Sequence, residues 1–309
     1  MNFKESLNGY LHWLEVNGYA KETIRSRRNC LRKFIADMNT KNIDDPKLVA
    51  PQDTEKYFVY LKTEYCHQGK PLSNIAVSNY ITSIAGFFKW LEETKRILMT
   101  PVINRPTVPR LNRIPVVLTE EETVKILESV SINTPTGIRN RAILELLYST
   151  GIRRGELVNL NVEDFIPERG ELTIIKGKGA KDRVVPVGEV AATFLQGYLS
   201  IIRPWQAKPE EPALFVNSAT GERLNGDWIR LILWEAVKRS GVQKRVTPHT
   251  LRHSMATHLL RNKADLRHIQ AILGHATLRT TQVYTHLTLD DLKRAIKENH
   301  PHGKRNPKS

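Results

Sequence analysis

The sequence carries cationic side chains at positions where a helix or a turn would end and leave them exposed. Arg153 and Arg154 follow directly after an expected helix stop, and Lys178 lies between two glycines of an expected turn. His249 and Arg252 are three residues apart, so a helix would place them on one face. Guanidinium groups match phosphoryl oxygens and neutralise the charge that builds up on them during phosphoryl transfer. These residue types therefore indicate chemistry on a phosphate.

Two more polar groups lie nearer the C-terminus. His275 follows the helix stop Leu273-Gly274, and Tyr284 comes nine residues later. Taken singly, each group has an ordinary structural interpretation, such as a helix cap for the histidine or core packing for the tyrosine. Taken together, two arginines, a lysine and two histidines could converge on one phosphate while the tyrosine supplies a nucleophile. The free pKa of tyrosine is about 10, so the phenol needs cationic neighbours or a base to release its proton.

Two other kinds of chemistry fit the sequence poorly. The Gly-Lys-Gly turn around Lys178 lacks the pattern G-x-x-x-x-G-K-[ST], which argues against a nucleotide-binding loop. His249 and His253 have the i, i+4 spacing of zinc ligands, but there is no H-E-x-x-H motif and no nearby Cys, Asp or Glu completes a ligand set. We therefore predict a site that uses no metal and no cofactor.

Length and charge narrow the class of protein. The chain has 309 residues, which favours two domains at roughly 150 residues per domain. Its 47 Lys+Arg and 32 Asp+Glu give a net charge of +15, which attracts polyanions. Nucleic acid is therefore the predicted partner; the alternative is a protein that is basic without binding nucleic acid. No apolar stretch could span a bilayer, and the N-terminus lacks the apolar core of a signal peptide. With two cysteines, Cys30 and Cys66, expected as reduced thiols, the sequence predicts a cytoplasmic protein without a membrane anchor.

The elements that must position these groups follow from apolar spacing and helix signals. Residues 1–99 are predicted to form four helices, the clearest of which begins after an N-cap at Ser73. Residues 100–116 combine prolines and arginines with little periodicity, which predicts a linker. The second helix also carries a basic run that includes Arg27 and Lys33. The candidates for contact with DNA phosphates are Lys21, Arg25, Arg28, Arg32, Arg105, Arg110, Arg113 and Lys181.

A second domain is predicted over residues 117–299. A capping box at Thr119 and Glu122 predicts a helix over residues 120–130, and β-branched segments at 171–175 and 183–187 predict a hairpin with Lys178 at its tip. The remaining predicted helices cover residues 139–150, 189–202, 227–240, 248–261, 266–273 and 278–284, followed by an amphipathic stretch from Leu289. Residues 300–309 are expected to form a flexible basic tail.

Five strings of the sequence resemble the signature motifs of the tyrosine recombinase (phage integrase) family, and they are most similar to those of its Xer-type members. The strings are Thr150-Gly-Ile-Arg-Arg-Gly-Glu-Leu157, Lys176-Gly-Lys-Gly-Ala-Lys-Asp-Arg183, Pro248-His-Thr-Leu-Arg-His-Ser-Met-Ala-Thr-His258, Leu273-Gly-His275 and Thr281-Gln-Val-Tyr-Thr-His286. The resemblance covers essentially the whole chain. It implies a mainly α fold with a small β-hairpin or sheet, in which an N-terminal helical core-binding (SAM-like) domain precedes a C-terminal tyrosine-recombinase catalytic domain.

The resemblance also implies an activity, namely site-specific DNA recombination through a 3′-phosphotyrosyl intermediate without metal or ATP. Tyr284 matches the nucleophile. Arg153, rather than its neighbour Arg154, and Arg252 match the pair that holds the non-bridging phosphate oxygens.

Three further residues match groups that transfer protons or bind the phosphate. Lys178 matches the lysine that protonates the leaving 5′-oxygen. His249 matches a proton-transfer and phosphate-binding group, and His275 matches a second hydrogen-bonding group. The same chemical class includes type IB topoisomerases, and a non-catalytic DNA-binding protein of this fold is a further alternative.

The resemblance implies partners as well. Relatives bind double-stranded DNA with paired half-sites and act as tetramers, so we expect a homo-tetramer on DNA or an assembly with a related recombinase. The last helix, with Leu289, Leu292 and Ile296, would dock on a neighbouring subunit; the alternative is a helix folded back on its own domain. These features are compatible with chromosome partition through dimer resolution and with DNA integration by a mobile element.

Overall fold

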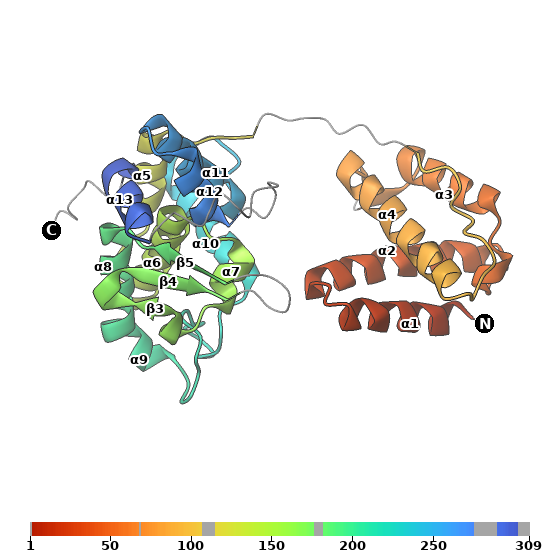
Figure 1. Cartoon of the computed structure of the whole chain (residues 1–309), viewed down its shortest axis with the longest axis horizontal. Helices are drawn as coiled ribbons and strands as arrows, with labels where there is room; N and C mark the ends of the chain where they lie inside the picture. Colours follow the sequence, from red (N-terminus) through yellow and green to blue (C-terminus); the bar gives the residue numbers. More distant parts are fainter. Residues whose placement is uncertain (1, 68, 107–114, 176–181, 275–288, 302–309) are drawn as a thin grey trace. The chain divides into compact units, whose positions relative to one another are not determined.

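The computed structural model describes residues 2–67, 69–106, 115–175, 182–274 and 289–301 (Figure 1). Contacts between Cα atoms divide the chain into two compact units, Met1–Arg113 and Ile114–Ser309. This division falls within residues 100–116, the segment predicted as a linker. Each unit has its own apolar core. Within the described ranges, no helix is long and apolar enough to cross a membrane.

The first unit consists of four long helices and a short hairpin. Its elements are α1 (Phe3–Val16), α2 (Lys21–Thr40), the 3-10 turn η1 (Pro46–Leu48), α3 (Pro51–Thr63), β1 (Cys66–His67), β2 (Lys70–Pro71) and α4 (Asn74–Glu93). The apolar faces of the helices meet around Phe34, which is fully buried and packs edge-on against Phe3, Tyr57 and Phe88. The four helices were predicted, but the antiparallel hairpin β1–β2 was not.

Two local features of this unit bear on the sequence predictions. Ser73 caps α4 as predicted, because its hydroxyl accepts a hydrogen bond from the backbone N–H of Ala76 at 3.3 Å. The first residues of the predicted linker pack on the unit: Val102 is buried, and the Pro101 carbonyl accepts a hydrogen bond from the Thr54 hydroxyl at 3.1 Å.

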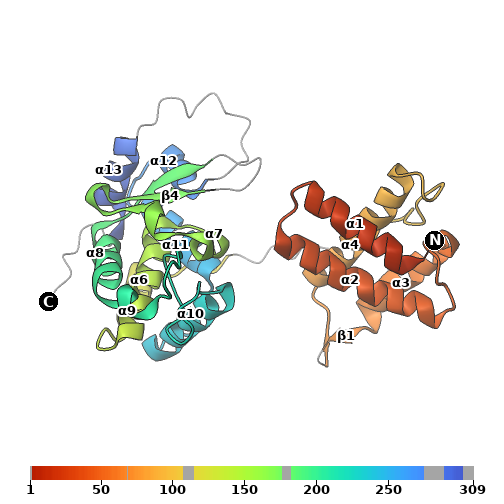
Figure 2. The ribbon, with the colours of Figure 1, turned by 90° about the horizontal axis from the view of Figure 1, so that it is seen from below.

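The second unit packs a ring of helices around one buried helix, with a small sheet at its side (Figures 1 and 2). Its elements are α5 (Glu120–Glu128), α6 (Pro135–Thr150), α7 (Arg154–Asn159), η2 (Val162–Asp164), β3 (Phe165–Ile166), η3 (Pro167–Arg169), β4 (Glu171–Ile174), β5 (Arg183–Pro186), α8 (Glu189–Gly197), the π-helical turn η4 (Tyr198–Ile202), α9 (Arg203–Gln206), α10 (Gly226–Ser240), α11 (Pro248–Arg261), α12 (Leu266–Leu273) and α13 (Leu289–Asn299). The buried helix is α6, which packs against α5, α8, α10 and α11. The mainly α fold with a small sheet agrees with the prediction.

The sheet contains the predicted hairpin and one additional strand. Strands β4 and β5 pair antiparallel, with Glu171 opposite Pro186 and Ile174 opposite Arg183. Strand β3 adds to the far edge of β4, and the order is β3-β4-β5. Helices α12 and α13 lie against β5. Arg183, the first residue of β5, is thereby placed beside the end of α12.

Helix α11 is fixed in the unit by buried hydrogen bonds. The Ser254 hydroxyl accepts from the Leu118 N–H at 2.9 Å, and His258 Nε2 lies 2.7 Å from the Leu118 carbonyl. Because a carbonyl only accepts, Nε2 carries the proton, and the Tyr148 hydroxyl donates to Nδ1 at 2.8 Å. Burial lowers the pKa of His258, which keeps this ring neutral. The helix that carries His249 and Arg252 is thus held at its middle.

The last helix and the residue after it bear on two predictions for the C-terminus. Leu292 and Ile296 are buried on their own unit, where α13 packs against β5, α11 and α12. In the single chain the helix is therefore folded back on its own domain, and docking on a neighbouring subunit stays a prediction. The prediction that a flexible tail begins at residue 300 is wrong for His300, which is fully buried. Its ring lies 4.7 Å from that of Tyr148, and its Nε2 bonds the Tyr148 carbonyl at 3.2 Å. These contacts fix His300 on the core of the second unit directly after α13.

Candidate active site

The turn after α6 places Arg153 at the start of α7. Helix α6 ends at Gly151, whose φ of +60° is readily adopted only by glycine, as the predicted helix stop requires. Ile152 is buried and anchors the turn, and Arg153 follows as the N-cap of α7. Its side chain remains 48% exposed, so its guanidinium is accessible from solvent.

The start of α11 supplies the second arginine. Thr247 caps the helix and Pro248 is its first residue, as predicted. His249 is the next residue and is exposed, whereas Arg252, three residues after it, is buried. Arg252 is therefore held by buried partners, whereas the side chain of His249 faces solvent.

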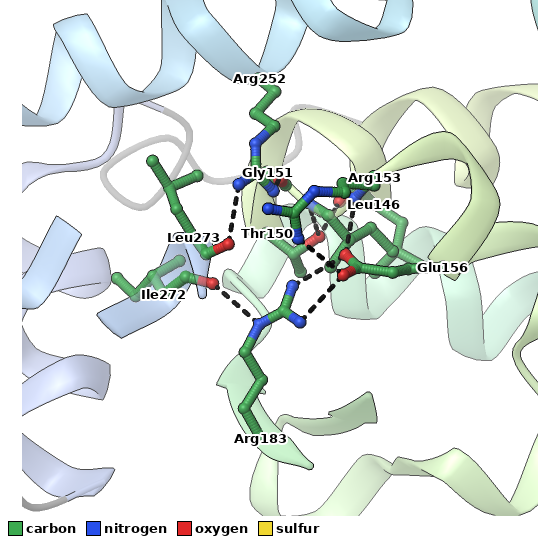
Figure 3. Close-up of polar contacts among 10 residues, drawn as sticks. Leu146, Thr150, Gly151, Arg153, Glu156, Arg183, Arg252, Ile272 and Leu273 are labelled. Carbon is green, nitrogen blue, oxygen red and sulfur yellow. Dashed lines mark hydrogen bonds and ion pairs between the residues drawn. The ribbon is translucent and has the colours of Figure 1, made fainter. Parts of the chain in front are cut away.

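Two helix ends brace the guanidinium of Arg252. Its Nη1 donates to the Gly151 carbonyl at 2.5 Å, and its Nη2 donates to the Leu273 carbonyl at 2.7 Å (Figure 3). Burial, with the nearby charge of Arg153, lowers the pKa of Arg252 to about 10. The group therefore stays charged at neutral pH, in an orientation set by the C-terminal ends of α6 and α12.

Glu156 links Arg153 to a third arginine. Its carboxylate accepts from the Arg153 backbone N–H at 2.8 Å and from Arg153 Nη1 at 2.9 Å. Arg183 donates to the same carboxylate from both terminal nitrogens, at 3.0 and 2.8 Å, and from Nε to the Ile272 carbonyl at 3.3 Å. Burial alone would raise the pKa of Glu156, but the hydrogen bonds from Arg183 and Arg153 lower it to about 2.

Glu156 and Arg183 were not predicted as site residues. The only sequence signal was the spacing of three between Arg153 and Glu156, which is that of a residue bonding back to a helix start. Arg183 lies 27 residues further along the chain, and no local pattern indicates its partner.

A cavity of about 860 Å³ brings three of the predicted catalytic residues together. Arg153, His249 and Arg252 all line it. Its wall is strongly cationic and includes residues that the sequence analysis missed, namely Arg230, Trp234 and Arg245. Trp234 is 56% exposed, so an aromatic face is available beside the cations. Such a cavity suits a polyanion with flat bases.

Arg154 also lines the cavity, but its partners differ from those of Arg153. Its Nη1 donates to the Gly226 carbonyl at 3.1 Å and lies 3.7 Å from the Asp227 carboxylate, both at the start of α10. Of these two neighbours, Arg153 is the one whose charge lowers the pKa of Arg252. Lys178, His275 and Tyr284, with the predicted helix over residues 278–284, lie outside the described residues.

Some predicted DNA contacts can be located on the first unit. Arg25 and Arg32 are exposed on α2, and Arg28 is partly exposed and shares a cleft with Arg32. Arg105 is exposed after the last helix of the unit. Lys21 begins α2. The candidates outside the described residues are Arg110, Arg113 and Lys181.

Two members of the basic run on α2 have partners inside the unit. Arg27 Nη1 donates to the Tyr10 hydroxyl at 2.6 Å, and Lys33 Nζ donates to the Tyr65 hydroxyl at 2.6 Å. Their charges therefore help to hold the helices together, while the remaining arginines of the run face solvent.

The histidine pair gives no metal site within the described part of the chain. There, no three His, Cys, Asp or Glu side chains gather in a way that could hold an ion. His253 lines a neighbouring groove between α11 and α12, together with His249.

Comparisons with known proteins agree with the sequence motifs. The model of the phage integrase family matches residues 116–290. The tyrosine recombinase XerD of Listeria innocua is 38% identical over 300 residues, which cover 96% of this chain and 98% of that protein. In the pre-cleavage crystal structure of the XerH site-specific recombinase bound to its difH substrate, the recombinase is 27% identical, with a TM-score of 0.63 over 88% of this chain and 78% of the other. A lambda integrase tetramer bound to a Holliday junction shares the fold, with a TM-score of 0.64 over 90% of this chain and 78% of the other at 16% identity.

Proposed function

Because the chain belongs to the phage integrase family and is a tyrosine recombinase that acts on DNA at specific sites, we propose that Tyr284 is its nucleophile and that Arg153, His249 and Arg252 bind the scissile phosphate. The observation that supports this assignment is the convergence of these three residues on one cavity, although they come from segments about a hundred residues apart. The proteins matched are recombinases and integrases, so neither a relaxing topoisomerase nor a non-catalytic DNA-binding protein is favoured.

The hydrogen-bond donors of the two arginines support a role in holding phosphate oxygens. A guanidinium has five N–H groups. In the described structure each terminal nitrogen of Arg252 donates one N–H to a backbone carbonyl. The guanidinium of Arg153 donates from Nη1 to Glu156. The N–H groups left over can bind the non-bridging oxygens, where charge develops as the phosphorus becomes five-coordinate.

The proposed reaction balances without ATP or metal. The Tyr284 oxygen attacks phosphorus and the bond from phosphorus to the 5′-oxygen breaks. The phenolic proton passes to His249, Lys178 donates a proton to the leaving 5′-oxygen, and His275 bonds the phosphate. The phosphotyrosyl ester keeps the energy of the broken bond, so a 5′-hydroxyl from another strand can attack it and release the tyrosine.

We assign DNA binding to both parts of the chain. Residues 1–99 are proposed as the DNA-binding domain, with Arg25, Arg28 and Arg32 on phosphates, and residues 117–299 as the catalytic domain after a linker over 100–116. The exposed arginines of α2 and the cationic cavity support this division. Assembly as a homo-tetramer on paired half-sites is proposed by analogy with the lambda integrase tetramer bound to a Holliday junction. A location in the cytoplasm is proposed because the relatives are recombinases that act on DNA.

The test uses a nicked suicide DNA substrate, on which cleavage traps the covalent adduct. Tyr284→Phe should abolish the adduct while a mobility-shift assay still shows binding. Tyr19→Phe, at a partly exposed tyrosine of the first unit, is the matched control and should form the adduct normally. Undiminished adduct from Tyr284→Phe would refute the assignment of the nucleophile.

A further inference from the structure

Arg183 lies at the junction of three segments that carry proposed catalytic residues. It is the first residue of β5, so it follows Lys178 by five positions in the hairpin. Its side chain is 11% exposed and reaches Glu156 with two hydrogen bonds, and its Nε reaches Ile272 near the end of α12 (Figure 3). It is not among the residues that line the cavity with Arg153 and Arg252, so we assign it an indirect role toward a phosphate bound there.

The end of α12 is fitted closely to this side chain. A Cβ at Gly274 would lie 2.8 Å from Arg183 Nε and 2.9 Å from its Cδ, and the φ of Gly274 is +62°. A side chain at residue 274 would therefore force Arg183 to move from the position in which it bonds Glu156. Arg252 bonds the carbonyl of Leu273 in the same turn, so one helix end helps to position both Arg183 and Arg252.

Glu156 is placed so that two arginines compete for its charge. Its Oε1 accepts from Arg153 Nη1 at 2.9 Å and from Arg183 Nη1 at 3.0 Å. The guanidinium groups of Arg153, Arg183 and Arg252 and the Glu156 carboxylate together carry two net positive charges. Without Arg183, the carboxylate would act on Arg153 alone, and the net charge of this cluster would fall to one.

We propose that Arg183 is a positioning residue that binds the Glu156 carboxylate in bidentate fashion and so leaves the charge and the N–H groups of Arg153 available to the scissile phosphate. The inference rests on the proposed function, because it assumes that Arg153 binds that phosphate. Arg183 acts through Glu156 and does not contact DNA in this role. A paired carboxylate in this place orients Arg153 through its backbone and side chain without neutralising it.

A double-mutant cycle tests this inference in the full-length protein. The measured quantity is the rate of covalent adduct formation on the nicked suicide substrate at saturating DNA. Arg183→Gln should lower this rate by about 10- to 100-fold, the range found when a residue that orients a directly acting group is removed, while the Kd for DNA changes by less than about 3-fold. In the Glu156→Gln background, where the side chain is neutral but can still accept a hydrogen bond, the same change should cost less than about 3-fold.

Two controls separate this role from a purely structural one. A structural role predicts the same loss from Arg183→Gln in both backgrounds, because the contacts with α12 are lost in each. Arg203→Gln removes an arginine that also bonds backbone carbonyls, those of Glu211 and Ala213, and should leave the adduct rate within about 2-fold once the protein is folded.

The outcomes are distinguishable. Equal losses in both backgrounds, or an Arg183→Gln rate within about 3-fold of wild type, would overturn the inference. If wild type itself forms no adduct through Tyr284, the proposed function fails first. If Arg183→Gln does not fold, Arg183→Lys replaces it: one ammonium cannot occupy both carboxylate oxygens, so the rate should fall by about 3- to 10-fold and the loss should again shrink when Glu156 is changed to Gln.

Discussion

Removing the charge of Glu156 should weaken the second unit at neutral pH and leave its stability unchanged in acid. Hydrogen bonds from Arg183 and Arg153 outweigh the effect of burial and lower the pKa of Glu156 from 4.5 to about 2. An unfolded chain binds the proton at about pH 4.5, whereas the folded protein resists it until about pH 2. The stabilisation is therefore complete above pH 4.5 and is lost as the pH falls towards 2.

The magnitude follows from this difference. At about 1.4 kcal/mol per pH unit, a fall from 4.5 to about 2 corresponds to roughly 3 kcal/mol of stabilisation at pH 7. The carboxylate is only 12% exposed, so solvent screens little of it. Glu156→Gln keeps the shape and one acceptor, so its free energy of unfolding should be lower than that of wild type by up to about 3 kcal/mol at pH 7 and by close to zero near pH 2.

The assay is urea unfolding at several pH values between 7 and 2.5, followed by amide hydrogen exchange in α6, which reports on the second unit alone. Other carboxylates titrate equally in both proteins, so the difference between wild type and variant isolates Glu156. Glu163→Gln, at an exposed position of the same unit, should differ from wild type by less than about 0.5 kcal/mol throughout. A deficit for Glu156→Gln that is the same at pH 7 and pH 3 would refute the reasoning.

Four further predictions concern the site and its supports. Arg252→Lys should slow adduct formation by about 100- to 1000-fold with DNA binding retained, because a compact ammonium lacks the planar fork of donors that spans the Gly151 and Leu273 carbonyls and still reaches the phosphate; a wild-type rate would contradict this. Gly151→Ala should lower the free energy of unfolding by about 1–3 kcal/mol, because a Cβ there would lie 2.9 Å from Leu273 Cδ2 at a φ of +60°, whereas Gly155→Ala, with open space around it, should not destabilise. His300→Ala should speed amide exchange in α13 by about 10-fold or more, since the helix loses its contact with Tyr148; unchanged exchange would show that the other contacts of α13 suffice. Cleavage should continue in EDTA at an unchanged rate, and its loss there would point to a metal-dependent site.

Helix caps, first-turn prolines and glycine stops predicted those helices whose ends are set by residues close together in the sequence. The capping box at Thr119 and Glu122 opens α5 as predicted, and the predicted boundaries of α11 and α12 match the structure, because a first-turn proline and a glycine stop act within a few residues. Strand β3 and the hairpin β1–β2 were missed. Each strand has only two residues, too few for a periodic pattern.

The residue types of the site could be predicted from the sequence, but the hydrogen bonds between them could not. Arg153 and Arg252 stood out by their places after a helix stop and on a helix face. The bidentate pair of Arg183 with Glu156, and the carbonyl partners of Arg252, join residues from 21 to 101 positions apart. Only packing brings them together, so no spacing rule reveals them. His300 was assigned to a flexible tail for the same reason. The polar sequence around it does not indicate that its ring packs on Tyr148 in the core.

The way in which two helices end on one cation bears on what the protein does before it meets DNA. The backbone dipoles of α6 and α12 each present about half a negative charge at the C-terminal end, and both ends bond Arg252. Together they offset roughly one elementary charge, so this cation is already compensated when no substrate is bound. Arg252 therefore does not depend on a bound anion to hold its orientation, and an incoming strand meets a donor that is already in place.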